Sequence, residues 1–250
     1  MKHHSNEESA EISLRPELSI VVLGYKAGEE LEKFIDQVYA IFSDHRVNFE
    51  CVIVANYWPD TGDTTPEVAK RCANKFPNIK VVAKEKAGMM GWDMRSGLEA
   101  CNGDVLAIID GDNQFPPNSL PTLYNKLIKG QFDMCKTVRE TRADGIYRIV
   151  ISRVYNLFFQ MLFPGSKFAD VNSKPKLMTR QAYEKMELLS NGWFIDAEIM
   201  IQARRFGFSI KEIPTQFRKN TRASFVKPIA IIEFIIELLK YRLKEFKHGK

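Results

Sequence analysis

Two aspartates separated by one glycine, Asp110 and Asp112, stand directly after the apolar run 105–109. Residues at alternate positions of a strand project to the same side, so at a strand end both carboxylates can meet one ligand. Hard carboxylate oxygens suit Mg²⁺ or Mn²⁺, and an ion held there would neutralise a diphosphate leaving group. Asp, Gly and Asn are also good turn formers, so a solvated turn is the alternative interpretation of 110–113.

The hydrophobic pattern of the first half predicts the elements that would position these carboxylates. Short apolar runs alternate with stretches in which apolar residues recur at helical spacing, which indicates repeated β-α-β units. Such units build an α/β fold with a mostly parallel central sheet and helices on both faces, and ligands bind beyond the carboxyl ends of its strands. Strands are expected at 18–23, 51–55, 79–83 and 105–109, and helices at 29–42, 65–75 and 91–100.

Longer helices dominate the pattern after Asp133, and we expect them to build the acceptor side around the sheet. The last one, 228–246, is amphipathic and is interrupted by charge too often to span a bilayer. It fits either a helix lying in a membrane interface or one packed on the domain or on a second copy. The other helices are expected at 146–163, 180–189 and 195–206.

Composition indicates one sizeable globular domain, because 45% of the 250 residues are hydrophobic and 27% are charged. We expect a flexible leader at 1–16, a main domain at 17–227 and an amphipathic C-terminal helix at 228–250. The leader is polar and lacks the apolar segment of a signal peptide. The four cysteines lie far apart without a Cys-x-x-Cys pair, which argues against a zinc site or disulfide framework and fits a reducing cytosol. The net charge of +5, with basic residues crowded in the second half, suits anionic partners.

The segment 105–117 resembles the family-2 glycosyltransferases of GT-A fold, and more narrowly the dolichol-phosphate and polyprenyl-phosphate sugar synthases. In those enzymes the same strand ends in Asp-x-Asp, a Gln follows two residues later, and two prolines come next. The resemblance extends over roughly 18–227. It implies a GT-A (Rossmann-like) fold and a metal-dependent enzyme in which Asp110, Asp112 and Gln114 bind Mg²⁺ or Mn²⁺.

The resemblance also implies a binding site for a nucleotide-sugar donor. Tyr25 is expected to border the nucleobase, Asn56 to reach a base edge, and Asp93 to touch the donor sugar or ribose. Ordinary structural roles stay open, since Tyr25 also fits an edge aromatic and Asp93 a first-turn acid favoured by the helix dipole. A basic segment resembles the loop that closes over the donor diphosphate, or is simply an exposed loop. Its candidates are Arg218, Arg222 and Lys227.

On the acceptor side, Arg139, Arg148 and Ser152 resemble the Arg, Arg and Ser that hold the acceptor phosphate in polyprenyl-phosphate sugar synthases. Arginine suits this role because its planar guanidinium binds phosphate oxygens with two hydrogen bonds. A solvated helix face is the competing interpretation of residues 148 and 152. In relatives with a hydroxyl acceptor, an acid at the position of Asp196 is the general base, whereas a phosphate acceptor is already anionic and needs it only to orient or bind.

The loop 170–176 resembles a family segment that lies beneath the donor sugar and reads roughly Asp-x-x-Ser-Gly-Phe-Arg. Asp170 and the basic Lys176 match that pattern, whereas Lys174 and Pro175 replace its Gly-Phe. This difference leaves the identity of the sugar open.

The residues and the resemblance together predict an inverting glycosyltransferase that moves a sugar from a UDP- or GDP-sugar to a polyprenyl (dolichyl or undecaprenyl) phosphate. We expect a role in cell-envelope glycan biosynthesis and a cytoplasmic protein peripherally associated with the cytoplasmic face of the membrane. Transfer to a hydroxyl of a glycan or lipid, with Asp196 as base, stays open, as does a non-catalytic glycosyltransferase-like binding protein. A homodimer is a further option. Nucleic acid is not expected, because the basic residues lack interleaved aromatic residues.

Overall fold

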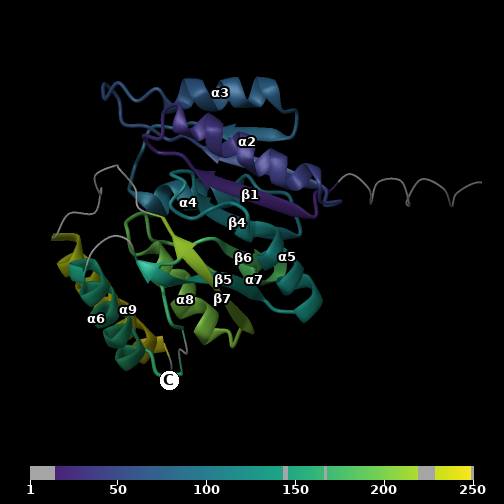
Figure 1. Cartoon of the computed structure of the whole chain (residues 1–250). Helices are drawn as coiled ribbons and strands as arrows, with labels where there is room; N and C mark the ends of the chain where they lie inside the picture. Colours follow the sequence, from purple (N-terminus) through teal and green to yellow (C-terminus); the bar gives the residue numbers. More distant parts are fainter. Residues whose placement is uncertain (1–14, 143–145, 166–167, 219–228, 249–250) are drawn as a thin grey trace, which may run out of the picture.

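The computed structural model describes residues 15–142, 146–165, 168–218 and 229–248. Their strands form one seven-stranded sheet in the order β3-β2-β1-β4-β6-β5-β7, with helices on both sides (Figure 1). The strands are β1 (Leu18–Leu23), β2 (Phe49–Val54), β3 (Ile79–Val82), β4 (Val105–Asp110), β5 (Met134–Arg142), β6 (Lys176–Thr179) and β7 (Ile210–Phe217). The helices are α2 (Glu30–Ser43), α3 (Thr65–Lys75), α4 (Met90–Glu99), α5 (Ser119–Gly130), α6 (Ile146–Leu162), α7 (Arg180–Lys185), α8 (Ile195–Arg205) and α9 (Ile229–His248).

The central strands are buried on both faces because successive side chains of a strand enter opposite layers. In β1, Ile20 and Val22 pack with the layer that contains α2, α3 and α5, whereas Val21 packs with the layer that contains α4 and α8. This arrangement confirms the predicted α/β fold with helices on both faces. The four strands expected in the first half agree with the observed ones to within two residues at each end.

The sheet brings the ends of several strands to one edge. The pairs among β3, β2, β1 and β4 are parallel, as is the pair of β5 and β7, whereas β6 runs antiparallel to β4 and β5. Ile108 of β4 lies opposite Lys176 of β6. Antiparallel partners progress in opposite directions, so two further steps in this register set Asp110 opposite Lys174. The carboxyl end of β4 and the loop before β6 therefore meet.

The strands expected from the sequence do not include β5 or β6, and α5 is likewise not among the expected helices. β5 carries Lys136 and Arg139, and Lys176 opens the four-residue β6, so neither strand shows an unbroken apolar run. The helix expected at 180–189 also proved shorter. α7 ends at Lys185 because the next residue, Met186, adopts an extended backbone conformation.

α6 and α9 lie side by side at one end of the molecule (Figure 1). Tyr155 of α6 and Phe234 of α9 contact each other with ring centroids 5.8 Å apart. An ion pair also joins α9 to α8: Arg204 Nη2 donates to the two carboxylate oxygens of Glu245, at 2.8 and 2.7 Å. Within the described ranges, no helix is long and apolar enough to cross a bilayer.

Candidate active site

Residues predicted to hold the donor diphosphate lie together at the end of β4. Asp110 is the last residue of that strand, and Asp112 Oδ1 accepts a hydrogen bond from the backbone N–H of Gln114 (3.0 Å). The carbonyl of Gln114 accepts in turn from the N–H of Arg218 (2.9 Å), which directly follows β7. The structure thus brings both aspartates, Gln114 and Arg218 to the same edge of the sheet.

The donor set at this edge fits a divalent cation. Asp110 and Asp112 offer hard carboxylate oxygens, and the Asp110 side chain is 26% exposed, so an ion can reach it from solvent. In the part of the chain that the structure describes, no three His, Cys, Asp or Glu side chains form a cluster that could hold a metal. An ion on the two aspartates would therefore complete its shell with oxygens of a bound diphosphate or water. The role of Gln114 as a ligand stays a prediction.

A chain of buried charges begins at Asp110. The ammonium of Lys174 lies 3.4 Å from Asp110 Oδ2 and 3.1 Å from Asp196 Oδ2. Lys176 lies 2.5 Å from the other carboxylate oxygen of Asp196, Oδ1. The sequence pattern singles out Asp196 and Lys176 but gives Lys174 no role. The register between β4 and β6 places Lys174 opposite Asp110. The sequence pattern does not predict β6, so it cannot reveal this position.

This network holds Asp196 as a carboxylate. Burial by itself raises the pKa of a carboxyl group, but Lys174 and Lys176 more than offset it, and the pKa of Asp196 lies below its ordinary value of 3.8. Burial likewise opposes the charge of Lys174, yet Asp110 and Asp196 raise the pKa of that ammonium above its ordinary value. Inside the protein, both carboxylate oxygens contact an ammonium group, so neither is free to take a proton from an acceptor hydroxyl. This geometry favours an orienting role for Asp196 over that of a general base.

The expected role of Asn56 needs correction. Asn56 follows β2 but is fully buried, and its amide nitrogen donates to Asp93 Oδ1 (3.0 Å) and Ser96 Oγ (2.9 Å). Its amide oxygen accepts a backbone N–H at 2.9 Å. Both polar atoms of its side chain are engaged inside the protein, so Asn56 positions Asp93 instead of reaching a base edge.

Asp93 belongs to a second cluster of predicted donor residues. It forms a buried ion pair with Lys86, whose ammonium lies 4.4 Å from the ring centroid of Tyr25. Burial lowers the pKa of Lys86 and raises that of Asp93, against their mutual attraction. Tyr25 and Asp93 thus share the contact with Lys86, which the sequence pattern misses.

The loop before α8 fixes the start of α4, where Asp93 lies. Carbonyl groups of Asn191 and Gly192 accept hydrogen bonds from N–H groups at the start of α4. A Cβ at Gly91 would lie 2.2 Å from the carbonyl oxygen of Ser190, so this close approach requires glycine. The loop therefore contributes to the position of Asp93.

Asp170 orients Arg139 on the predicted acceptor side. The guanidinium donates from Nε (2.6 Å) and Nη2 (2.7 Å) to the two carboxylate oxygens. Ser152 is half-buried on α6. Arg148 belongs to the same helix, but its side chain is outside what the structure describes. Two residues of the predicted donor loop also lie outside the described residues: Arg222 and Lys227.

Comparison with known families agrees with this arrangement of acids and strands. A sequence profile described as "Glycosyl transferase family 2" matches residues 19–187, which is more than half of the chain. The chain belongs to glycosyl transferase family 2. The matched region contains Asp110, Asp112 and the loop that carries Lys174.

Two curated members of the wider group match most of this family-2 chain. It is 28% identical over 222 residues to glycosyltransferase AglD of Haloferax volcanii, and 25% identical over 239 residues to dolichol-phosphate mannosyltransferase of Pyrococcus furiosus. These matches cover 85% and 92% of this chain. The chain spans 35% and 64% of the length of the two relatives.

A solved structure supports the GT-A architecture of this family-2 chain. Glucosyl-3-phosphoglycerate synthase from Mycobacterium tuberculosis, in complex with Mn²⁺, UDP-glucose and phosphoglyceric acid, matches with a TM-score of 0.73. The match covers 96% of this chain and 85% of the synthase at 18% identity. At that identity the likeness shows a shared fold.

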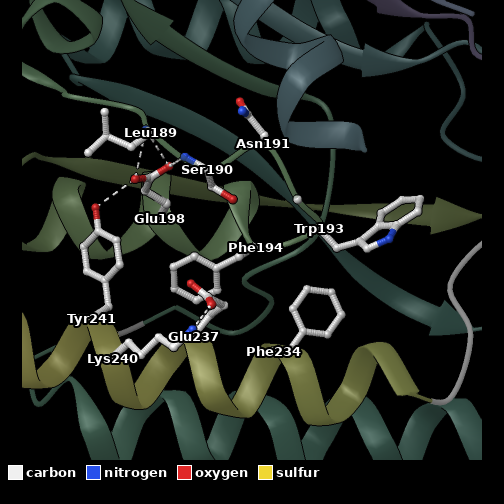
Figure 2. Close-up of a pocket in the computed structure, with 11 residues that line it drawn as sticks. Leu189, Ser190, Asn191, Trp193, Phe194, Glu198, Phe234, Glu237, Lys240 and Tyr241 are labelled. Carbon is white, nitrogen blue, oxygen red and sulfur yellow. Dashed lines mark hydrogen bonds and ion pairs between the residues drawn. The ribbon is translucent and has the colours of Figure 1, made fainter. Parts of the chain in front are cut away.

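A cavity of ≈610 Å³ lies between the start of α8 and α9 (Figure 2). Side chains of Trp193, Phe194 and Phe234 contribute to its wall. On one side, Glu198 accepts hydrogen bonds from two backbone N–H groups of the loop before α8 and from the hydroxyl of Tyr241 (2.9 Å). These bonds tie the loop to α9. The family-2 chain therefore has a cavity with four aromatic residues in its wall, beside the helix that carries Asp196.

Tyr155 is a further polar residue near the site that sequence reasoning misses. Its buried hydroxyl has no hydrogen-bond partner among the described residues. Burial raises the pKa of Tyr155, and the charge of Asp196 raises it further, so the hydroxyl lies within the field of that carboxylate. Tyr155 follows Ser152 by three residues on α6 and shares its face. The spacing from Ser152 is the only sequence signal that points to it.

Proposed function

We propose that this chain transfers a sugar from a nucleoside-diphosphate sugar to the phosphate of a polyprenyl lipid at a membrane surface. The pairing of Asp196 with Lys174 and Lys176 is the observation that carries the proposal. These ammonium groups contact both carboxylate oxygens of the buried Asp196, which makes it a weak base with neither oxygen free for an acceptor hydroxyl. A phosphate acceptor is already anionic and needs no base, whereas a hydroxyl acceptor does.

The donor half of the proposal rests on the two aspartates at the end of β4. Asp110 and Asp112 would hold Mg²⁺ or Mn²⁺, and the ion would neutralise charge on the diphosphate leaving group. The fold-related synthase that was solved with Mn²⁺ and UDP-glucose supports this choice of ion and donor class. Asp93 faces the donor sugar or ribose, Tyr25 borders the base, and Arg218 lies against the diphosphate.

In the transfer, a phosphate oxygen of the acceptor attacks the anomeric carbon. A new carbon–oxygen bond forms while the bond from that carbon to the diphosphate oxygen breaks, and the nucleoside diphosphate leaves with the electron pair. Arg139, held in place by Asp170, presents its remaining N–H groups to the acceptor phosphate. Arg148 and Ser152 complete the phosphate site. Attack opposite the leaving group inverts the anomeric configuration, as the family resemblance implies.

Exposed apolar side chains support a lipid as the carrier of that phosphate. On α6, Val154, Leu157 and Met161 are 61%, 59% and 72% exposed. An exposed face of this kind suits the interface of a bilayer, and the cavity beside Phe234 offers an apolar wall to a lipid chain. The name of the relative from Pyrococcus furiosus, dolichol-phosphate mannosyltransferase, points to a lipid phosphate in that protein. α9 contributes further exposed apolar residues: Ile235, Ile236, Leu239 and Leu243.

A transfer assay with paired acceptors tests the proposal. Radiolabelled UDP- and GDP-sugars are offered with Mn²⁺ to a short-chain prenyl phosphate and to the prenyl alcohol of the same length. We expect product from the phosphate and none from the alcohol. The second pKa of a phosphate monoester is about 6. The rate with the phosphate should therefore rise up to about that pH and then stay constant, because no carboxyl group of the protein has to titrate.

The opposite pattern identifies a hydroxyl acceptor. Transfer to the alcohol, with a rate that depends on a group titrating near neutral pH and is abolished by Asp196→Asn, would show that Asp196 acts as a base after all. That result would replace the phosphate acceptor with a hydroxyl and leave the donor site unchanged.

A further inference from the structure

The ammonium of Lys174 is fixed beside the proposed metal ligand Asp110. The lysine side chain is 4% exposed, and its Nζ lies between Asp110 Oδ2, at 3.4 Å, and Asp196 Oδ2, at 3.1 Å. Met90 Sδ is a third neighbour of the ammonium at 3.3 Å. The backbone is anchored too, because the carbonyl of Lys174 accepts a hydrogen bond from the hydroxyl of Thr137 (2.5 Å). Withdrawing the ammonium would leave buried negative charge only partly compensated, so its position is stable.

A divalent ion that binds Asp110 would therefore meet the ammonium of Lys174 already beside that carboxylate. Pairing with Lys174 offsets part of the negative charge that would attract the ion, and the ammonium repels the ion at short range. A nucleoside diphosphate reverses this balance. It brings additional oxygen ligands and several negative charges to the same edge of the sheet, and both favour a hard cation.

We propose that Lys174 makes cation binding depend on the donor: the ion binds the Asp110 site weakly alone and strongly together with a nucleoside diphosphate. Lys174 is a positioning residue in this scheme, because it acts through Asp110. The nature of the donor rests on the proposed function. Since coupling between two ligands is reciprocal, the ion raises the affinity for the diphosphate by the same factor.

Calorimetric titration of Mn²⁺, first alone and then with saturating UDP or GDP, tests this role in the wild type and two matched variants. Lys174→Met and Lys176→Met each remove one buried ammonium from Asp196 and leave the other, so neither leaves that carboxylate without a partner. Only Lys174 also contacts Asp110. The pair therefore separates a specific effect on Asp110 from a general change of buried charge.

We expect Lys174→Met to tighten the binding of Mn²⁺ alone by about tenfold or more, and Lys176→Met to change it by less than about threefold. The gain in Mn²⁺ affinity on adding the diphosphate should be large in the wild type and smaller in Lys174→Met. Unchanged binding of Mn²⁺ alone in Lys174→Met would overturn the proposal. Equal tightening in both variants would overturn it as well, because the effect would then come from overall charge.

A second neutral variant, Lys174→Gln, guards against a local folding defect, and thermal unfolding checks each protein before titration. If Lys174→Met does not fold, the comparison of Lys174→Gln with Lys176→Met decides. Failure of the proposed function has a different signature. If neither UDP nor GDP binds the wild type in the presence of Mn²⁺, the assignment of the donor is wrong. The change in affinity for Mn²⁺ alone on loss of Lys174 still decides the role of Lys174.

Discussion

Buried charge decides what the single residues of this site can do. Asp196 is fully buried yet ionised, because Lys174 and Lys176 each place an ammonium on one of its oxygens. A carboxylate with both oxygens held in this way is a weak base and is placed to bind and orient. The position of Asp196 at the start of a helix is visible in the sequence, whereas its partners become apparent only when β6 is placed beside β4.

Asp196→Asn should be strongly destabilising. The amide would leave Lys174 and Lys176 buried without a counter-charge on α8, and breaking a buried ion pair in this way costs about 3–5 kcal/mol of unfolding free energy. Urea unfolding monitored by circular dichroism measures the loss. Asp36→Asn is the matched control, because it removes the same charge from an exposed pair with Lys75 and should cost far less. Equal losses would contradict the buried network.

The same pair of proteins predicts a pH dependence. The folded-state pKa of Asp196 is lowered, so its contribution to stability is complete above the ordinary value of 3.8 and disappears as pH falls through the folded-state value. The difference in unfolding free energy between wild type and Asp196→Asn should therefore shrink below about pH 4, where Asp196 of the wild type becomes protonated. A difference that begins to shrink near pH 6 would show that Asp196 titrates close to neutrality.

At the scale of elements, sequence reasoning succeeds where burial is apolar and fails where it is charged. β1 and β4 are almost entirely apolar, and α2 has apolar residues at helical spacing, because packing decides most of their residues. β5 and β6 carry Lys136 and Lys176 inside the sheet, paired with acids from distant parts of the chain. Long-range pairing of this kind leaves no local pattern. The acids of the site are therefore predictable from the sequence, whereas the pairing of Asp196 with Lys174 and Lys176 is not.

The contact between α4 and the loop before α8 yields a test at this scale. In Gly91→Ala, the added Cβ meets the carbonyl oxygen of Ser190 at 2.2 Å and must displace backbone, which should cost about 1–3 kcal/mol of unfolding free energy. Gly192→Ala changes the other side of the same contact but meets nothing within 4 Å, so its stability should stay close to that of the wild type. Chemical denaturation compares the two variants. Equal stability would contradict the close packing of this loop on α4.

At the scale of the whole molecule, the proposed donor site and the proposed membrane surface occupy different regions. The two aspartates lie at an edge of the sheet, whereas α6 and α9 form a paired unit at one end of the molecule (Figure 1). Exposed apolar residues on these helices, including Leu157 and Met161, make the surface of that end partly apolar. A lipid acceptor would bring the two regions into one reaction, because its phosphate must reach the site while its chain stays in apolar surroundings.

Vesicle binding tests this division. Leu157→Glu combined with Met161→Glu should reduce co-sedimentation with vesicles that contain anionic lipids by about tenfold or more, because two exposed apolar contacts are lost and two negative charges are added. Ile128→Glu is the control, since Ile128 is an exposed apolar residue on α5, away from α6 and α9 (Figure 1). Equal binding by the wild type and the double variant would remove the membrane from the proposed function.

The most direct measurement of the central claim is donor binding at the end of β4. Calorimetry with UDP-, GDP- and dTDP-sugars, in the presence of Mn²⁺ and then of a chelator, compares the wild type with Asp112→Ala. The account predicts that at least one donor binds the wild type in a metal-dependent manner and that Asp112→Ala, although folded, loses this binding. Binding that survives both the chelator and the substitution, or a folded wild type that binds no donor, would contradict it.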